Sequence, residues 1–146
     1  MLLPTKTATR DSPVVNDATE RHIEDTKLCA RILSVDPAIR VAAVVDGIEI
    51  SGFASSLKTG NLLSENSGLK DRIGFLGRVV TEIGRQTEPL FGSLESISFA
   101  LDRLKLVTIP LSASRSIGLS VEKSTNPDLL VSKIRSRLGL KTIDSC

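Results

Sequence analysis

The stretch NSGLKDRIGFLGRVVTEIGRQTEPLF, from Asn66 to Phe91, carries the longest regular apolar pattern in the chain. Six apolar residues and one threonine recur at alternating steps of four and three: Leu69, Ile73, Leu76, Val80, Ile83, Thr87 and Leu90. This spacing predicts one helix of about seven turns with a single apolar stripe. Because runs of strand type lie on both sides of the helix, we expect a small antiparallel sheet to cover that stripe.

The same helix carries three glycines, Gly74, Gly77 and Gly84, with Thr81 between them. They lie about 100° round the helix from the apolar stripe. Each helix-interior glycine costs about 1 kcal/mol relative to alanine, so we expect a contact that offsets this cost. One explanation is close approach of another backbone, such as the same helix of a second subunit. The other is a helix held strongly by its other face, or packed closely on its own sheet.

The residues before this helix predict a tail, a helix and a hairpin. Residues 1–15 lack the apolar core of a signal peptide and are predicted to be a disordered tail. Asn16 or Asp17 caps a helix that runs to about Ser34, with this apolar side: Ile23, Leu28, Ala30, Ile32 and Leu33. Residues 39–45 and 48–53 then read as two strands joined by an Asp46-Gly47 turn of type I′, and residues 54–65 as a loop.

The residues after the long helix predict three strands and a last helix. The strands are residues 95–101, 104–111 and 116–123, of which the first alternates apolar and polar side chains. Asn126 caps the last helix, Pro127 takes its first position and Gly139 ends it. We therefore expect one domain over residues 16–139 and a frayed tail over residues 140–146.

Composition excludes several classes of protein. The chain has 146 residues and a net charge of +2 with both signs interspersed, so we expect no nucleic acid as a partner. No apolar run approaches the 18 to 20 residues that a membrane span needs, so we expect no membrane partner. Two distant cysteines, Cys29 and Cys146, form no disulfide framework and favour the cytoplasm.

No residue pattern points to catalysis, a metal or a cofactor. His22 is the only histidine, and its acidic neighbours on one helix turn favour a solvated side chain over a metal site. Cys29 reads as a buried small hydrophobe rather than a nucleophile, because no histidine is positioned to activate it. The run Gly68–Gly74 lacks the glycine-lysine-serine/threonine ending of a phosphate loop. The chain is therefore not expected to be an enzyme or to bind a cofactor.

The order helix, two strands, long helix, three strands and helix resembles the roadblock / dynein-light-chain domain, a relative of the profilin-like fold. The resemblance is carried by the residues IRVAAVVDGIEI, from Ile39 to Ile50, and by the closing hairpin of residues 104–111 and 116–121. The stretches around Leu28–Leu33, Asp36–Arg40 and Ile109–Leu111 are also similar to an uncharacterised group of small archaeal proteins.

This resemblance implies an α/β fold with a five-stranded antiparallel sheet. Counted along the chain, the strands would lie in the order second, first, fifth, fourth, third, with the long helix on one face and both terminal helices on the other. Roadblock domains are typically non-enzymatic dimers that act as scaffolds or regulators for small GTPases and motors. The third strand and the long helix would form the dimer interface, here through Gly74, Gly77, Thr81, Gly84, Glu95, Ile97, Phe99 and Leu101.

Two functions therefore remain open. The first is a roadblock-like homodimer that acts as a scaffold or regulator, with a small GTPase or another protein as its partner. The alternative is a small-molecule sensor of profilin-like form, with a pocket under the loop of residues 54–65.

Overall fold

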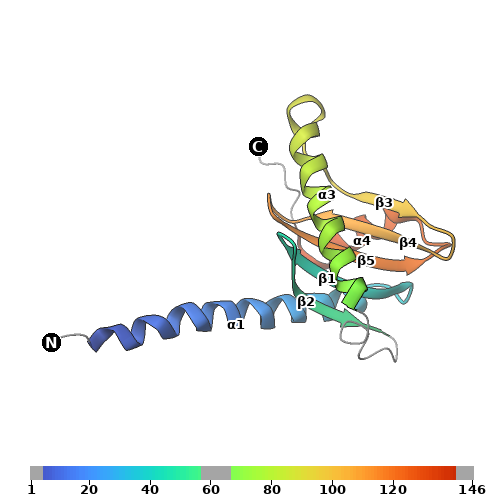
Figure 1. The fold of residues 1–146 in the computed structure, drawn as a ribbon. Coiled ribbons are helices and arrows are strands. Elements are labelled where there is room, and N and C mark those ends of the chain that lie inside the picture. The colour runs from blue at the N-terminus through green and yellow to red at the C-terminus, as the bar shows by residue number, and fades with distance from the viewer. Residues whose placement is uncertain (1–4, 57–66, 141–146) are drawn as a thin grey trace.

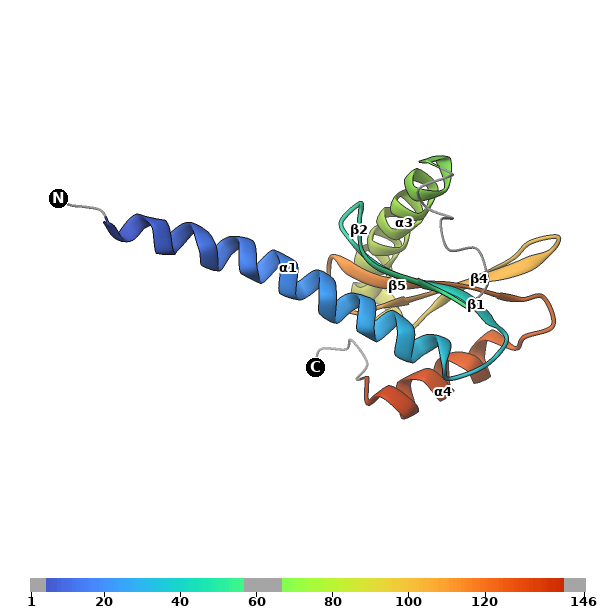
Figure 2. The same ribbon diagram turned by 90° about the horizontal axis from the view of Figure 1, so that it is seen from below.

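The computed structural model describes the backbone of residues 5–56 and 67–140. Its elements follow the predicted order: α1 (Thr5–Leu33), β1 (Ile39–Asp46), β2 (Glu49–Ser55), α3 (Ser67–Phe91), β3 (Ile97–Ala100), β4 (Leu104–Pro110), β5 (Arg115–Glu122) and α4 (Pro127–Leu138). The strands form one antiparallel sheet in the order β2-β1-β5-β4-β3 (Figure 1). Figure 2 shows α3 on one face of this sheet and α1 and α4 on the other. The predicted fold class is confirmed.

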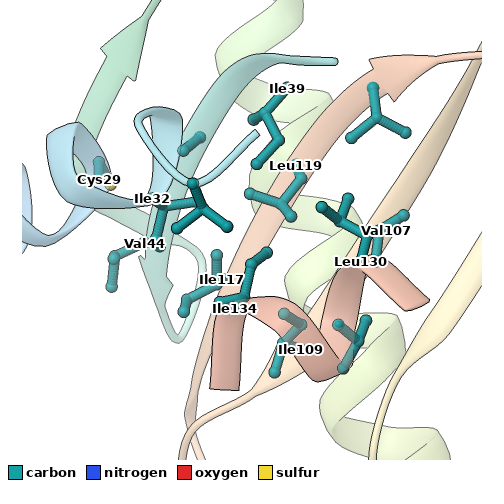
Figure 3. Packing of buried hydrophobic residues seen from close by; sticks show 14 residues of the cluster. Cys29, Ile32, Ile39, Val44, Val107, Ile109, Ile117, Leu119, Leu130 and Ile134 are labelled. Carbon is teal, nitrogen blue, oxygen red and sulfur yellow. The ribbon is translucent and has the colours of Figure 1, made fainter. Parts of the chain in front are cut away.

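The main hydrophobic core lies between the sheet and the helices α1 and α4. Alternate residues of the central strands point to this face, and those that follow Arg115 on β5 are large and apolar: Ile117, Leu119 and Val121. They pack against Ile32 of α1 and Ile134 of α4, both fully buried (Figure 3). Branched aliphatic side chains therefore form the main core on this face.

The hairpin between β1 and β2 differs from the prediction by one residue. Asp46 still pairs with Glu49, so the two connecting residues are Gly47 and Ile48 rather than Asp46 and Gly47. Gly47 has a φ of 67°, and no non-glycine residue among those described has a positive φ. A positive φ at only the first connecting residue is the pattern of a type II′ turn, not type I′. Pairing of Asp46 with both neighbouring strands extends β1 and moves the turn.

Helix α1 is longer than predicted and begins at Thr5. The expected start at Asn16 or Asp17 was based on capping residues, and such residues permit a start without requiring one. A helix that is held by packing at one end adds a hydrogen bond for each further residue. Its N-terminal part projects away from the sheet (Figure 1). The domain limits of residues 16 and 139 stay a prediction, and residues 1–4 and 141–146 lie outside the described residues.

Helix α3 contacts the sheet through its glycines. The sheet was expected to bury the apolar stripe of this helix, but it buries only part of it. A Cβ atom on Gly74 would lie 2.5 Å from the Ile48 carbonyl oxygen, and one on Gly77 would lie 2.7 Å from the Val45 side chain. Val80 is buried, but Ile83 is exposed. Helix and hairpin backbones approach so closely that only glycine fits between them. This contact turns part of the apolar stripe away from the sheet.

The last helix begins and ends as predicted. The Asn126 side chain accepts a hydrogen bond from the backbone N–H of Leu129, Pro127 occupies the first turn, and Gly139 ends the helix with a φ of 68°. Local sequence signals therefore set both ends of α4.

Candidate interaction surface

Strand β3 forms one edge of the sheet, because β4 is its only neighbour among the described strands. Its register places Ile97 opposite Thr108 and Phe99 opposite Leu106. Ile97 and Phe99 therefore point to the α3 face, where both are half-buried. An edge strand with unpaired backbone groups can pair with a strand of another chain.

The residues that flank β3 are tied to the rest of the chain through their backbone carbonyls. The Arg135 guanidinium donates to the Glu95 carbonyl at 2.9 Å. The Lys123 ammonium donates to the Leu101 carbonyl. The Leu101 side chain remains exposed. The predicted strand of residues 95–101 is thus shorter than expected, but its ends are held in place.

An apolar flank of α3 faces away from the sheet. We call Phe75, Val79, Ile83 and Leu90 the outer flank, because at 100° per residue they fall within about 80° of one another. Phe75 and Leu90 are 63% and 76% exposed. Phe91, at the end of the helix and 82% exposed, follows them. Large exposed apolar side chains in one area are typical of a surface that binds another protein.

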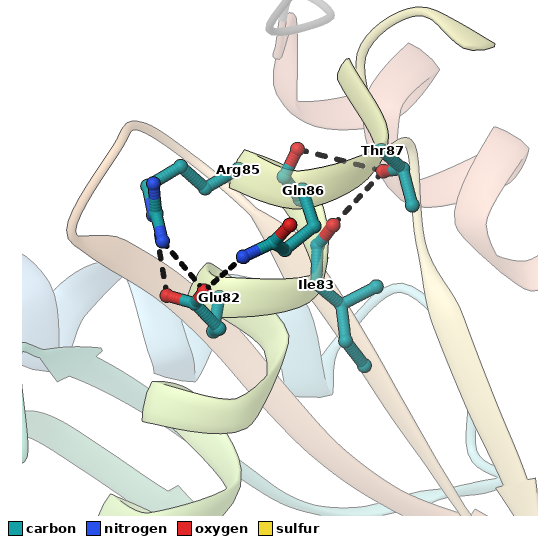
Figure 4. Close-up of polar contacts among 6 residues, drawn as sticks. Glu82, Ile83, Arg85, Gln86 and Thr87 are labelled. Carbon is teal, nitrogen blue, oxygen red and sulfur yellow. Dashed lines mark hydrogen bonds and ion pairs between the residues drawn. The ribbon is translucent and has the colours of Figure 1, made fainter. Parts of the chain in front are cut away.

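Polar side chains border the C-terminal half of this flank (Figure 4). Arg85 donates two hydrogen bonds to the Glu82 carboxylate, at 2.7 and 3.2 Å, and Gln86 donates a third at 2.8 Å. The hydrogen bonds from Arg85, the larger contribution, and from Gln86 lower the pKa of Glu82. The hydroxyl of Thr87 bonds back to the Ile83 carbonyl at 2.9 Å. An apolar centre with a charged border is the usual arrangement of a protein-binding patch.

The structure does not bring all the predicted interface residues together. Gly74 and Gly77 are buried against the chain's own hairpin. Thr81 and Gly84 are half-buried, and both line a cavity of about 300 Å³ that Leu94 also lines. The Thr81 hydroxyl donates to the Gly77 carbonyl at 3.0 Å. Of the two explanations for the glycines, close packing on the chain's own sheet describes Gly74 and Gly77.

A charged cluster that the sequence did not reveal joins α1 to the sheet. Arg115 of β5 donates to both carboxylate oxygens of Asp25, at 2.8 and 3.1 Å, and Ser51 of β2 donates to the same carboxylate. Asp46 lies 3.5 Å from the Arg115 guanidinium. His22 Nδ1 lies 2.9 Å from the Ser51 carbonyl oxygen. The cluster fixes α1 across β2 and β5.

The electrostatics of this cluster keep Asp25 ionised. Burial alone would raise the pKa of Asp25, but the hydrogen bonds from Arg115 and Ser51 outweigh it and hold the pKa below its ordinary value of 3.8. The hydrogen bond to Asp25 in turn raises the pKa of Arg115. A periodicity signal was available, because Asp25, Cys29 and Ile32 share one helix face and all three are buried. Ile23, expected on the apolar side, is exposed.

Cys29, which was considered as a nucleophile, occupies an unreactive setting. Cys29 is fully buried, and this burial, together with the nearby Asp25, raises the pKa of its thiol to about 12. A thiol in this state is a poor nucleophile at neutral pH.

No group of three or more histidine, cysteine, aspartate or glutamate side chains that could hold a metal ion occurs within the described residues. None of the helices that the structure describes is long and apolar enough to cross a membrane.

A cavity of about 310 Å³ lies between α3 and the central strands. Its lining comes from both sides: Ile73, Leu76 and Gly77 of α3, with Val41, Ala43, Val45, Leu104, Leu106, Thr108, Ser116, Gly118, Leu119 and Ser120 of the sheet. The alternative sequence prediction placed a pocket under residues 54–65, but residues 57–66 of that loop lie outside the described residues. The cavity lies on the α3 face, and the predicted pocket under the loop stays a prediction.

Comparison with solved structures shows the same fold at low sequence identity. A Roadblock/LC7 domain from Streptomyces avermitilis is 13% identical, with a TM-score of 0.52 over 78% of this chain and 97% of that one. Myxococcus xanthus MglB is 14% identical, with a TM-score of 0.59 over 80% and 84%. MglB in a tetrameric arrangement is 14% identical, with a TM-score of 0.55 over 82% and 83%. The chain matches no protein-family model and no curated protein. It has the roadblock fold, as the resemblance predicts.

Proposed function

We propose that this chain is a non-enzymatic roadblock-like module that forms a homodimer and acts as a scaffold or regulator, with a small GTPase as its candidate partner. The observation that carries the proposal is the position of β3 at the edge of the described sheet, together with the outer flank of α3, which is apolar and exposed. A second copy could pair its own β3 with this edge and cover the outer flank. An MglB structure with the same fold is described in a tetrameric arrangement, which supports association between copies.

The proposed interface keeps the β3 side chains and changes the role of the glycines. Ile97 and Phe99, with the flanking Glu95 and Leu101, would meet the partner strand. Thr81 and Gly84 would lie near the helix contact. Gly74 and Gly77 would support the interface indirectly, because they let α3 sit close to the hairpin and so present the outer flank.

The oligomeric state of two matched variants tests the interface. Phe75→Glu places a charge on the outer flank, and Leu129→Glu places the same charge at a similarly exposed position, 69% against 63%, on the opposite side of the sheet. We expect light scattering after size-exclusion chromatography to give a dimer for the wild type and Leu129→Glu and a monomer for Phe75→Glu. Neither change should alter stability by more than about 0.5 kcal/mol, because both side chains are exposed.

Phe99→Lys tests the strand edge in the same assay. A lysine on the edge strand opposes pairing with a second strand, so this variant should also be a monomer, with its fold checked by circular dichroism. A wild type that is monomeric at high micromolar concentration would contradict the proposed dimer.

The GTPase part of the proposal has its own test. Purified small GTPases, loaded with GDP or with a non-hydrolysable GTP analogue, would be titrated into the wild type and Phe75→Glu by calorimetry. We expect binding that depends on the nucleotide state and is weakened when the dimer is lost. The absence of binding across the panel would leave a dimeric scaffold for another class of protein partner.

A further inference from the structure

We propose that the cavity between α3 and the sheet is a binding site for a small neutral molecule that is mostly apolar and carries a hydroxyl or carbonyl group. The cavity volume of about 310 Å³ falls at the lower end of the range for small-molecule sites, roughly 300 to 1,000 Å³. The cavity belongs to one chain and lies under α3, so this site is distinct from the proposed dimer interface.

The cavity exists because the central strands carry small residues on this face. Along β5 the residues Ser116, Gly118 and Ser120 line the cavity, whereas Ile117 and Val121 are fully buried in the core on the opposite face. A Cβ atom on Gly118 would meet no atom within 4 Å, and its φ is not positive. Neither a close contact nor a special backbone conformation therefore explains this glycine. Glycine inside a central strand weakens it, and here its consequence is open space.

Two buried hydroxyl groups supply the polar part of the site. Thr108 and Ser116 are 6% and 3% exposed, and both line the cavity. With Ser120, they supply the side-chain polar groups of the described lining. A hydroxyl can both donate and accept. A ligand oxygen placed between β4 and β5 would therefore find hydrogen-bonding groups there.

The other residues that line the cavity indicate that its ligand is uncharged. No lining residue among those described carries a charge, and most of the wall is aliphatic. Burial of an unpaired charge is strongly unfavourable, so an ionised ligand is disfavoured. A neutral medium-chain alcohol or ketone has the matching chemistry: an aliphatic part for the walls and one oxygen for the hydroxyls.

The test uses a neutral fluorescent probe, N-phenyl-1-naphthylamine, with 1-octanol and octanoate as competitors. We expect saturable enhancement of probe fluorescence, loss of this signal on addition of 1-octanol, and no loss with octanoate at the same concentration. 1-Octanol should also raise the melting temperature, because it binds only the folded state.

Three variants locate the site. Gly118→Leu fills the cavity and should weaken probe binding at least tenfold, while its melting temperature is not lowered. Ala30→Leu adds the same side chain at an exposed position on α1, on the other face of the sheet, and should bind as the wild type does. Thr108→Val keeps the shape but removes one hydroxyl, and it should weaken 1-octanol binding about fivefold, as expected for one lost hydrogen bond.

Several results would overturn the inference: no probe binding by the wild type, equal binding by Gly118→Leu, or displacement by octanoate as effective as by 1-octanol. Binding that appears only in the monomeric Phe75→Glu would also overturn it, because a second copy would then cover the cavity. A wild type that is monomeric but binds the probe would contradict the proposed dimer and leave this site supported.

Discussion

The two faces of the sheet use the same strands but differ in how fully they are covered. Toward α1 and α4, residues such as Ile109 and Ile117 are completely buried in a continuous core. Toward α3, the neighbouring residues Thr108 and Gly118 border a cavity of about 310 Å³. The alternation of a β-strand lets one sequence specify both faces independently. In this protein one face is filled by the main core and the other keeps open space beneath α3.

The largest expected effect comes from removing a side chain on the filled face. Ile117→Ala should lower the free energy of unfolding by about 2 to 5 kcal/mol, because the surrounding core cannot collapse into the space. Urea denaturation followed by circular dichroism measures this loss. A cost below about 1 kcal/mol would mean that the α1/α4 face does not dominate stability.

The charged cluster on the filled face should have the next largest effect. Asp25→Asn leaves the Arg115 guanidinium with Asp46 as its remaining carboxylate, at 3.5 Å. We expect a loss of about 1 to 3 kcal/mol in urea denaturation at neutral pH, because a charged hydrogen-bond partner is removed from a mostly buried site. Asp36→Asn, which removes a more exposed carboxylate that pairs with Lys133, serves as the control and should cost less. Equal losses of unfolding free energy in the two variants would show that the Asp25 cluster stabilises the fold no more than the exposed pair of Asp36 and Lys133 does.

Acid should reduce the difference between the wild type and Asp25→Asn. The pKa of Asp25 is lower in the folded state than its ordinary value of 3.8, so its contribution is fully present above that value and is lost as the pH falls through the folded pKa. Unfolding free energies measured from pH 6 down to pH 2 should therefore converge for the two proteins. A difference that stays constant over this range would contradict the assignment of an ionised Asp25.

The smallest effect, of opposite sign, is expected on the open face. Gly118→Ala places a methyl group where no atom lies within 4 Å and should raise the free energy of unfolding by about 0.5 to 1 kcal/mol. The matched measurement is urea denaturation beside Ile117→Ala. If Gly118→Ala were as destabilising as Ile117→Ala, the two faces would be equally well packed and the contrast between them would fail.

Short-range patterns in the sequence were sufficient for the elements and their order. The Asp46-Gly47 pair located a hairpin to within one residue, and Asn126-Pro127 and Gly139 set the ends of α4. The order of the strands followed from the family resemblance of these elements, and the structure has that order. The turn and capping signals each act over a few residues, so they are present in the sequence before any tertiary contact forms.

The tertiary structure alone decided the orientation of α3, the partner of Asp25 and the cavity. The sequence shows an apolar stripe and a glycine stripe on α3, but the choice between them depends on how closely the hairpin backbone approaches, as it does at Gly74. Asp25 and Arg115 are 90 positions apart, and nothing local links them. The cavity needs small residues of two strands to meet beneath one helix. Such features depend on distances between elements, which sequence periodicity does not encode.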